Sequence, residues 1–364
     1  MAVRILHCAD LHMDSPLESL SPEKAAVMRR EQRELVMNIA DIAKENEVDL
    51  VFFAGDIFDS ALAYYETCDV LSEAFEKIAV PVFIAPGNHD YFCSASPYAF
   101  MSFSENVHVF KSQIIESVEL EDLGVRVYGA GFTSADSANI LSGFTVQDDD
   151  KINLAVLHAN LMGEAYNRIT VENIAESGLD YLALGHIHAY SGLCTAGKTC
   201  YAYPGCPQGR GFDETGDKGV IIAEVSKYDT QIRFVPTAKR KYLELSCDVS
   251  KFPSVSEAAA DALGAYNTDN IVRLTLTGER PNDFDCAEIE NELKDAAFTI
   301  TVRDRTTYAR DIWEGLSEDT LRGSFLRIMN KKLAAAETDE EKDKIMLAVK
   351  YALAALENRE EREI

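Results

Sequence analysis

Five short polar clusters in the first 190 residues combine the residue types that bind divalent metal ions. Each follows directly on a short apolar run, and the clusters are Asp10-Leu11-His12, Gly55-Asp56-Ile57-Phe58-Asp59, Gly87-Asn88-His89-Asp90, His158-Ala159-Asn160 and Gly185-His186-Ile187-His188. Mixed nitrogen and oxygen ligands suit Mn²⁺, Fe or Zn²⁺ rather than Ca²⁺. Two divalent ions about 3.5 to 4 Å apart can neutralise a phosphodiester and activate water. The clusters therefore predict metal-assisted phosphoester hydrolysis with two metal ions.

The expected metal ligands divide between the two ions. One ion is expected to bind Asp10, His12, Asp56 and His188. The other is expected to bind a set that shares the bridging carboxylate, namely Asp56, Asn88, His158 and His186. His89 has no ligand role in this scheme, so it could donate a proton to the leaving oxygen as a general acid, with Asp90 as its orienting partner.

The other polar candidates have competing structural explanations. A lone His after a strand is more often a structural residue than a ligand, but five of the seven histidines lie in these clusters, which argues against coincidence. His7 is expected inside the first strand, where it could orient a ligand, and His108 is expected to be an ordinary strand residue. Asp59 could orient a ligand or face the substrate, but we favour a cap on the following helix.

The clusters require strands that end at a common edge. Runs with the length and the Val, Ile, Leu and Phe content of buried strands lie at residues 3–8, 50–54, 82–85, 152–157 and 181–184. Helical patterns at 22–46 and 63–79 separate the first three runs, which predicts βαβ crossovers and a parallel sheet. Because sites in α/β sheets form at the carboxyl ends of strands, the ligands should gather at one edge. Gly55, Gly87 and Gly185 should relieve crowding where the backbone approaches the ions.

The remaining segments predict a second sheet and two further domains. Short strands with Gly punctuation at 107–131, and hairpins around Ala196-Gly197 and Thr215-Gly216, indicate a second and more antiparallel sheet. The expected fold class is α/β, a two-sheet sandwich with flanking helices. A strand-helix-strand-helix-strand order at 241–303 predicts a small α+β domain. The expected domains are 1–240 for the sandwich, 241–310 for the α+β domain and 311–364 for a C-terminal helical segment.

The C-terminal segment from about residue 316 is predicted to form a helical hairpin that breaks near Thr338-Asp339. Helical spacing places apolar residues on a common face of each helix, namely Leu321, Phe325 and Ile328 in the first and Ile345, Val349, Leu353 and Leu356 in the second. This apolar face either packs within the chain itself or docks on a partner, and both alternatives remain open.

The composition is that of a globular protein with a strongly acidic surface. The chain is 47% hydrophobic and 26% charged, and no run approaches the roughly 18 apolar residues that a membrane span requires. The N-terminus has no signal-peptide pattern and the eight cysteines form no metal-binding pair, so we expect a cytoplasmic protein with free thiols. The net charge of −26 opposes electrostatic binding of nucleic acid by this chain alone.

The five clusters, in this order, resemble the calcineurin-like metallophosphoesterase superfamily. Further stretches are similar to DNA repair exonucleases of the SbcD and YhaO type, namely Arg4-Ile5-Leu6-His7-Cys8-Ala9-Asp10, Asp14-Ser15-Pro16-Leu17, Tyr203-Pro204-Gly205-Cys206-Pro207-Gln208-Gly209-Arg210 and Glu214-Thr215-Gly216-Asp217-Lys218-Gly219. The resemblance is strong over about residues 1–240. It implies a four-layer αββα nuclease domain with two Mn²⁺ ions, a capping domain over DNA, and a C-terminal helical element that binds an SMC-like ATPase of the SbcC or YhaN type. It also implies a homodimer through helices near residues 62–105.

Two positions depart from the pattern of that family. Asp59 stands where archaeal and eukaryotic members have a second catalytic His, so no role of that His is carried over. Cys206 stands where Asn or Ser is expected. Arg210 could contact a substrate phosphate or brace the neighbouring Asp213 or Glu214.

Three functions are compatible with these features. The leading hypothesis is a Mn²⁺-dependent DNA exonuclease and endonuclease subunit whose ATPase partner supplies the basic surface for DNA. A phosphodiesterase or phosphatase for small substrates would share every ligand and would tolerate the negative charge, although the domains after the sandwich argue against it. A non-catalytic scaffold is the third hypothesis, and the intact ligand set argues against it.

Overall fold

The computed structural model describes residues 2–60, 62–147, 150–161, 163, 165–264, 268–280, 284–308, 313–336 and 338–356. By contacts the chain divides into two compact units. The first comprises Met1–Leu245, Leu263–Leu274 and Glu290–Val302, and the second comprises Ser246–Ala262, Thr275–Ile289 and Arg303–Ile364. The predicted domain boundaries near 240 and 310 stay predictions. Among the described residues, no helix has the length and apolar character needed to span a membrane.

The first sheet has six strands in the order β12-β11-β1-β2-β3-β4. Its strands are β1 (Ala2–Cys8), β2 (Leu50–Phe53), β3 (Val82–Ile84), β4 (Val107–Val109), β11 (Gly219–Ser226) and β12 (Thr230–Pro236). Strands β1 to β4 are parallel, whereas β11 is antiparallel to both β1 and β12. The first three apolar runs therefore form neighbouring parallel strands, as predicted.

The second sheet has the order β5-β6-β7-β8-β10-β9. Its strands are β5 (Glu116–Leu120), β6 (Val125–Gly129), β7 (Ile152–His158), β8 (Tyr181–Gly185), β9 (Cys194–Ala196) and β10 (Thr199–Ala202). Strands β6, β7, β8 and β10 are parallel and only the edge strands are antiparallel, so the expected antiparallel character is wrong for most of this sheet. The hairpin around Ala196-Gly197 is confirmed. The hairpin around Thr215-Gly216 is wrong, because β10 and β11 belong to different sheets.

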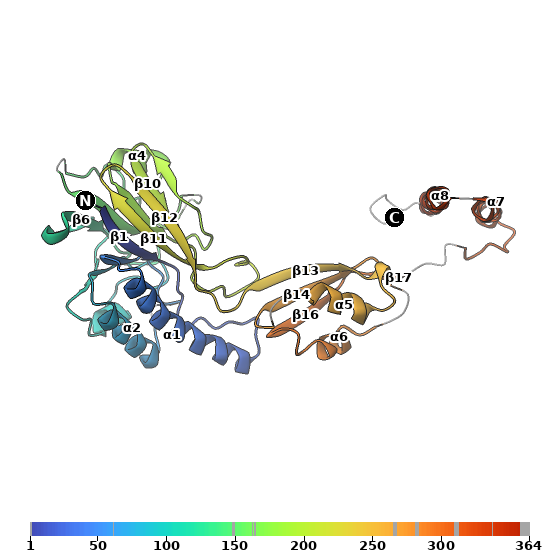
Figure 1. The fold of residues 1–364 in the computed structure, drawn as a ribbon, viewed down its shortest axis with the longest axis horizontal. Coiled ribbons are helices and arrows are strands. Elements are labelled where there is room, and N and C mark those ends of the chain that lie inside the picture. The colour runs from blue at the N-terminus through green and yellow to red at the C-terminus, as the bar shows by residue number, and fades with distance from the viewer. Residues whose placement is uncertain are drawn as a thin grey trace. The chain divides into compact units, whose positions relative to one another are not determined.

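The two sheets pack face to face and helices cover their outer faces, which gives the expected four-layer sandwich (Figure 1). The helices are α1 (Pro22–Glu45), α2 (Tyr65–Ile78), α3 (Pro97–Phe100) and α4 (Val171–Ser177). Successive strand residues point to opposite faces. Phe52 therefore packs inward with Leu154, while Phe53 packs outward with Phe75 of α2. Ile174 of α4 packs on the outer face of the second sheet. Because both faces of the central strands are covered, their sequences are continuously apolar.

Local signals fix the ends of the main helices. Ser21 caps α1 by accepting a hydrogen bond from the Lys24 amide (3.4 Å), and Pro22 occupies the first turn, where its missing N–H is not needed. A reciprocal capping box between Thr170 and Asn173 begins α4, and Gly178 ends it in the left-handed conformation. These caps are the physical reason that the predicted start of α1 is correct.

The later elements follow the predicted strand-helix-strand-helix-strand order. They are β13 (Tyr242–Asp248), α5 (Val255–Leu263), β14 (Ile271–Thr277), α6 (Cys286–Glu292) and β16 (Thr299–Asp304), and the three strands form a sheet in the order β13-β14-β16. A two-stranded pair joins β15 (Glu279–Arg280) and β17 (Thr307–Tyr308), and the 3₁₀ helices are η1 (Glu121–Leu123) and η2 (Val249–Lys251).

The C-terminal segment contains the two predicted helices, α7 (Leu321–Ala335) and α8 (Asp339–Leu356). They share a small core in which Leu326, Val349 and Leu353 are buried. Leu321 and Ile328 are 74% and 58% exposed, whereas Phe325 packs against this small core. Packing within the chain and docking on a partner therefore both stay predictions for the apolar face.

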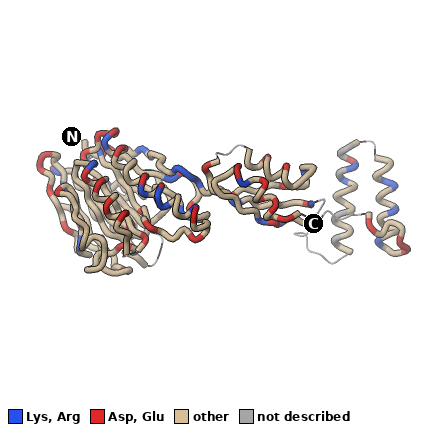
Figure 2. Tube along the Cα trace, turned by 90° about the horizontal axis from the view of Figure 1, so that it is seen from below, with Lys and Arg blue, Asp and Glu red and all other residues tan. Residues whose placement is uncertain are grey.

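Charge is distributed rather than collected at one place. Asp and Glu positions occur throughout the chain, with Lys and Arg interspersed among them (Figure 2). The basic run Lys239-Arg240-Lys241 is paired with acidic partners: Lys239 and Arg240 both pair with Glu31, Arg240 also pairs with Asp269, and Lys241 pairs with Asp217. Arg240 also lies over the Phe298 ring at 3.7 Å. This basic run is therefore a structural junction rather than a free cationic surface.

Candidate metal centre

The five ligand clusters meet at one edge of the sandwich, although they come from both sheets. Strands β1, β2 and β3 of the first sheet and β7 and β8 of the second sheet all end there. Hydrogen bonds join the two sheets at this edge. His158 Nδ1–H donates to the Ala54 carbonyl (2.9 Å), and the His186 amide donates to Asp10 Oδ1 (2.9 Å). The sandwich thus brings together residues that lie as far as 176 positions apart in the chain.

Asp10, His12 and His188 form the first group of converging ligand atoms, which lie within 4.8 Å of one another. The Nε2 atoms of His12 and His188 are 3.2 Å apart. His12 Nδ1–H is donated to Asp59 (3.1 Å), and His188 Nδ1–H is donated to Glu214 (2.7 Å). In these tautomers both Nε2 atoms carry lone pairs directed at one point, which is the arrangement that a metal ion satisfies.

Asn88, His158 and His186 form a second convergence. His158 Nε2 lies 2.9 Å from Asn88 Oδ1, and His186 Nδ1 lies 3.2 Å from the same oxygen. The two imidazole nitrogens are 3.3 Å apart. Because His158 donates its Nδ1–H to the Ala54 carbonyl, its Nε2 carries the lone pair in the neutral imidazole. The two imidazole nitrogens and the Asn88 amide oxygen are then acceptors that face one another, and a cation between them would stabilise this arrangement.

Asp56 lies between the two groups. Its carboxylate groups with Asp10 and His158 on one side and with His12 and His89 on the other. Burial alone would raise the pKa of Asp56, but the facing imidazoles of His158 and His12 hold it well below its usual range. Burial lowers the pKa of His158, and the Asp56 charge outweighs this and raises it to about 9. A bound metal ion would take the place of that proton on His158.

The residues present therefore fit two divalent ions that share Asp56. The donor set combines carboxylate, amide oxygen and imidazole, which suits first-row transition metals. Asp10, His12, Asp56 and His158 are at most 1% exposed. Asn88, His186 and His188 are half-buried and His89 is exposed, so the centre opens to solvent on their side.

His89 occupies the open side of the centre. Its amide donates to Asp56 Oδ1 (2.9 Å), and its Nδ1–H donates to the Asp59 carbonyl (3.0 Å). The ring meets His12 edge to face with centroids 4.8 Å apart. These contacts fix the ring while leaving Nε2 available for a substrate atom.

Asp90 does not lie where the sequence placed it, as an orienting partner of His89. Its buried carboxylate accepts hydrogen bonds from the amides of Asp56, Ile57, Phe58 and Gly87 at 2.7 to 3.3 Å, and from the Tyr98 hydroxyl. Asp90 therefore fixes the loop that carries Asp56, while the Asp59 carbonyl orients His89.

A family profile described as calcineurin-like phosphoesterase matches residues 3–190, which span more than half of the chain and all seven expected ligands. The chain belongs to the calcineurin-like phosphoesterases. This family uses a two-metal centre, and the candidate ligand groups of this chain lie inside the matched region. The family resemblance read from the sequence is thereby confirmed.

Three relatives illustrate the spread of the similarity. The Bacillus subtilis protein named uncharacterized metallophosphoesterase YhaO is 29% identical over 296 residues, which cover 76% of this chain and 72% of that protein. The Methanopyrus kandleri DNA double-strand break repair protein Mre11 is 25% identical, with coverage of 59% and 51%. A subunit of the Bacillus subtilis nuclease SbcCD is 24% identical, with coverage of 61% and 66%. The last two matches thus cover less than two thirds of those relatives.

A layer of charged residues supports the imidazoles of the phosphoesterase centre. Asp59 accepts hydrogen bonds from His12 Nδ1 and from Arg210 Nη1 (2.9 Å), so its predicted role as a helix cap is wrong. Arg210 also binds Glu214, which confirms one of the two alternatives for that arginine. Burial raises the pKa of Glu214, but His188 and Arg210 hold it well below its usual range. The hydrogen bond between Glu214 and His188 is not among the sequence predictions. The sequence points to Glu214 only through its spacing of four residues from Arg210.

Three glycines permit the close approach of backbone to the centre, as predicted. A Cβ on Gly55 would overlap the His158 ring, and Gly55 has a φ of +87°. A Cβ on Gly87 would overlap the Asp56 carboxylate, and one on Gly185 would overlap the Ala54 carbonyl. Any side chain at these positions would displace a candidate ligand or its support.

Several candidate ligands have left-handed backbone conformations that non-glycine residues seldom adopt. The φ angles are 54° for Asp10, 44° for His12, 51° for Asp56 and 101° for His186. Each costs on the order of 1–3 kcal/mol, and such strain is concentrated at functional sites. Hydrogen bonds from the Asp10 amide to the Gly55 carbonyl (3.0 Å) and from the His12 amide to the Asp56 carbonyl (2.9 Å) hold the strained turns in place.

The two remaining histidines lie outside the centre. His7 accepts a hydrogen bond at Nδ1 from the Tyr181 hydroxyl (3.0 Å) and donates from Nε2 to the Leu184 carbonyl (3.1 Å), so it joins the two sheets and orients no ligand. Burial lowers its pKa to about 3. His108 packs between Phe83 and Phe110 in β4, as expected of an ordinary strand residue.

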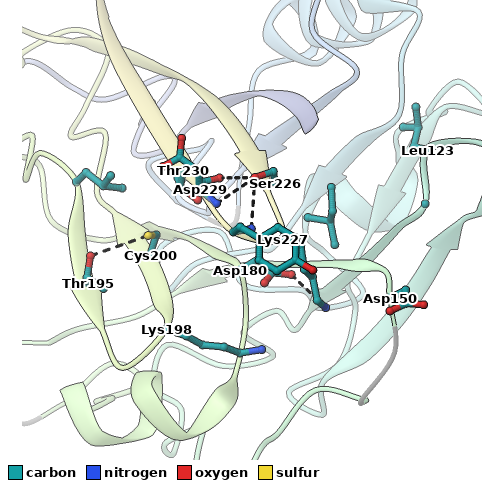
Figure 3. A pocket seen from close by; sticks show the side chains of 14 residues that line it. Leu123, Asp150, Asp180, Thr195, Lys198, Cys200, Ser226, Lys227, Asp229 and Thr230 are labelled. Carbon is teal, nitrogen blue, oxygen red and sulfur yellow. Dashed lines mark hydrogen bonds and ion pairs between the residues drawn. The ribbon is translucent and has the colours of Figure 1, made fainter. Parts of the chain in front are cut away.

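A pocket of about 1060 Å³ lies at the opposite ends of β7 and β8 (Figure 3). Lys227 donates to the Lys151 carbonyl (2.7 Å) and lies 3.7 Å from the Asp180 carboxylate, so these two charges of the lining are paired. The lining contains none of the seven expected ligands. The pocket is therefore separate from the phosphoesterase chemistry.

Proposed function

We propose that this phosphoesterase is the nuclease subunit of a DNA repair complex and hydrolyses DNA phosphodiesters with two divalent ions, foremost Mn²⁺. The convergence of lone pairs from both sheets around Asp56 is the observation that carries the proposal. Site A would be formed by Asp10, His12, Asp56 and His188. Site B would be formed by Asp56, Asn88, His158 and His186.

The protein groups would divide the chemical work as follows. When bound, two such ions supply the Lewis acidity that neutralises a phosphodiester and activates the attacking water. His89 would hold a proton at Nε2 and transfer it to the leaving oxygen, because its Nδ1–H is already donated to the Asp59 carbonyl. Asp90 would keep Asp56 between the ions through the loop amides that it binds.

The relatives support DNA as the substrate. Two of the proteins that match the chain are named as a DNA double-strand break repair protein and as part of a nuclease with more than one kind of chain. The second of these names also supports a partner, and an SMC-like ATPase is the partner that we propose. Exposed apolar side chains on the C-terminal helices, namely Leu321, Ile328, Leu347 and Tyr351, support docking there. Deletion of residues after 316 should then abolish ATPase binding and spare diester hydrolysis, whereas loss of solubility would favour packing within the chain.

A homodimer is the second association that we propose. Leu62, Tyr64, Tyr65 and Phe100 lie in the region proposed for the dimer contact and are 53% to 82% exposed, and exposed apolar patches mark protein–protein contact sites. Light scattering of the full chain should give the mass of a dimer, and Tyr65→Glu should shift it to that of a monomer. A monomeric mass for the unaltered chain would remove this part of the proposal.

Negative charge is the feature that favours a different substrate. The net charge is −26, and the basic run at Lys239-Arg240-Lys241 is paired with Glu31, Asp269 and Asp217. DNA binding by the isolated chain should therefore be weak, and the ATPase would supply the cationic surface. A phosphodiesterase for small substrates would need no such surface and is the second candidate.

One assay separates these functions. The purified chain with Mn²⁺ should cleave labelled duplex and single-stranded DNA as well as bis(p-nitrophenyl) phosphate. Hydrolysis of the chromogenic ester without any cleavage of DNA, even with the ATPase added, would favour the small-substrate enzyme. Absence of all three activities would refute the phosphoesterase proposal.

Substitution of the proposed acid tests the mechanism in the same assay. His89→Gln should lower the rate on DNA by about 10²–10⁴-fold, because general acid catalysis contributes roughly that factor. Mn²⁺ binding should remain, since His89 is not a proposed ligand. His108→Gln, at a histidine away from the centre, is the matched control and should retain activity. An unchanged rate in His89→Gln would show that the leaving oxygen takes its proton elsewhere.

A further inference from the structure

Arg210 connects the supports of two different metal ligands. Its Nη1 donates to Asp59 Oδ1 (2.9 Å) and its Nη2 donates to Glu214 Oε1 (2.7 Å). The same two oxygens accept the Nδ1–H of His12 (3.1 Å) and of His188 (2.7 Å), respectively. A continuous chain of hydrogen bonds therefore runs from one imidazole through Asp59, Arg210 and Glu214 to the other.

This chain of contacts is well fixed. The Arg210 side chain is 16% exposed and the Glu214 side chain is 4% exposed. Glu214 Oε2 is held separately by the Arg210 amide (2.8 Å) and by the Cys206 thiol (3.6 Å). A planar guanidinium presents its two terminal nitrogens in a rigid fork, so the spacing of the two carboxylates is set by Arg210 itself.

Site B is supported differently. His158 is oriented by the Ala54 carbonyl at the end of β2, a backbone group fixed by the sheet. The His186 amide is held by Asp10, and its ring lies against Tyr166 with centroids 5.5 Å apart. Within the part of the chain that the structure describes, the hydrogen bonds of Asp59, Arg210 and Glu214 reach neither of these rings.

We propose that Asp59, Arg210 and Glu214 form a bracket that positions both imidazoles of site A, so that Arg210 controls the metal affinity of site A and leaves site B unaffected. The inference rests on the two-ion centre proposed above. It makes Arg210 a positioning residue: the guanidinium holds the carboxylates, the carboxylates hold the Nδ1–H groups, and the two Nε2 lone pairs stay directed at one point.

The physical consequence is selective loss of one ion. Without the guanidinium, two carboxylates remain side by side in a partly buried place and repel each other, which would pull the two imidazoles apart. Groups that orient metal-bound imidazoles contribute about 10- to 100-fold to metal affinity. Arg210→Met should therefore weaken one of two Mn²⁺ sites by about that factor and leave the other unchanged.

Metal binding, rather than activity, is the readout. Mn²⁺ titration of the full chain by calorimetry should show two ions for the unaltered protein and one weakened site in Arg210→Met. Electron paramagnetic resonance should change from the signal of a coupled pair to that of a single Mn²⁺ when the metal is limiting. In the Arg210→Met background, Asn88→Ala should remove the remaining tight site, whereas His188→Ala should not.

Arg126→Met is the matched control. Arg126 is also a buried arginine bound to a carboxylate, that of Glu119, but it is the second residue of β6 and lies at the end of the sheet away from the ligands. This variant should bind two ions with unchanged affinities, which separates the bracket from a general effect of losing a buried cation. Circular dichroism of each variant verifies folding before titration.

Arg210→Lys distinguishes the fork from its charge. A lysine retains the positive charge but cannot hold two carboxylates in a fixed geometry, so site A should stay weakened. Full recovery with Lys would overturn the bracket as described. Equal weakening of both sites in Arg210→Met, or no weakening, would also overturn it. If the unaltered chain bound no Mn²⁺, the proposed two-ion function itself would fail, which is a distinguishable result.

Discussion

Replacement of Asp90 by Asn should loosen the loop that carries Asp56 without touching a proposed metal ligand. The Asp90 carboxylate accepts five hydrogen bonds, and Oδ1 takes those from the amides of Gly87 (2.7 Å) and Asp56 (3.2 Å). An Asn in the same rotamer has a single carbonyl oxygen, so it can accept only the hydrogen bonds that one of the two carboxylate oxygens of Asp90 accepts. Its NH₂ group then faces donors on the other side, so at least two buried amides lose their acceptor.

The size of the effect follows from those two amides. A buried donor left unsatisfied costs about 1–3 kcal/mol, so Asp90→Asn should lower the free energy of unfolding by about 2–6 kcal/mol. A typical domain has about 5–15 kcal/mol to lose, so the variant should remain folded at low temperature. Its Mn²⁺ affinity should fall as well, because the backbone of Asp56 is no longer held.

Urea denaturation and Mn²⁺ calorimetry on the same preparation measure both effects. Asp180→Asn is the matched control, since Asp180 is a buried carboxylate that accepts the Asn153 amide (2.8 Å) far from the centre, and it should destabilise the fold while sparing metal affinity. If Asp90→Asn changed neither the free energy of unfolding nor the Mn²⁺ affinity but slowed hydrolysis, Asp90 would act on His89 after all. The proposed role of Asp90 in fixing the Asp56 loop would then be refuted.

Three further outcomes are expected. The folded pKa of His7 is lowered to about 3 from 6.5, so the contribution of His7 to stability is complete above pH 6.5. Below pH 6.5 the unfolded chain takes up a proton that the folded chain does not bind, and this contribution is lost at about 1.4 kcal/mol per pH unit. Urea midpoints between pH 6.5 and 5.5 should therefore fall more steeply for the unaltered chain than for His7→Gln. Gly185→Ala should cost about 1–3 kcal/mol or more in unfolding free energy, because its methyl would meet the Ala54 carbonyl, and a smaller loss would indicate that the sheets can separate there. Free Mn²⁺ at roughly 100 times Kd should stabilise the chain by about 2.7 kcal/mol, a shift that a chelator reverses in a thermal melt and that Asp56→Asn should largely lack.

The ligand inventory and its strands could be predicted from the sequence because both depend on short-range features. Apolar runs of strand length followed at once by Asp, Asn or His mark carboxyl ends of strands, and Ser21-Pro22 marks the start of α1. The order of strands and helices in the small α+β region after residue 241 could also be predicted, since each element carries its own periodicity.

Only the tertiary structure decided which of these elements are neighbours and which polar groups serve the ligands. The clusters of His158 and His186 come from the second sheet, and Asp59 supports His12 through a partner at Arg210, 151 residues away. Asp90 turned out to hold the loop of Asp56, although its sequence position beside His89 suggested otherwise. A sequence reveals which groups stand at the ends of strands. The packing of two sheets determines which lone pairs converge, because that depends on distances that no local pattern encodes.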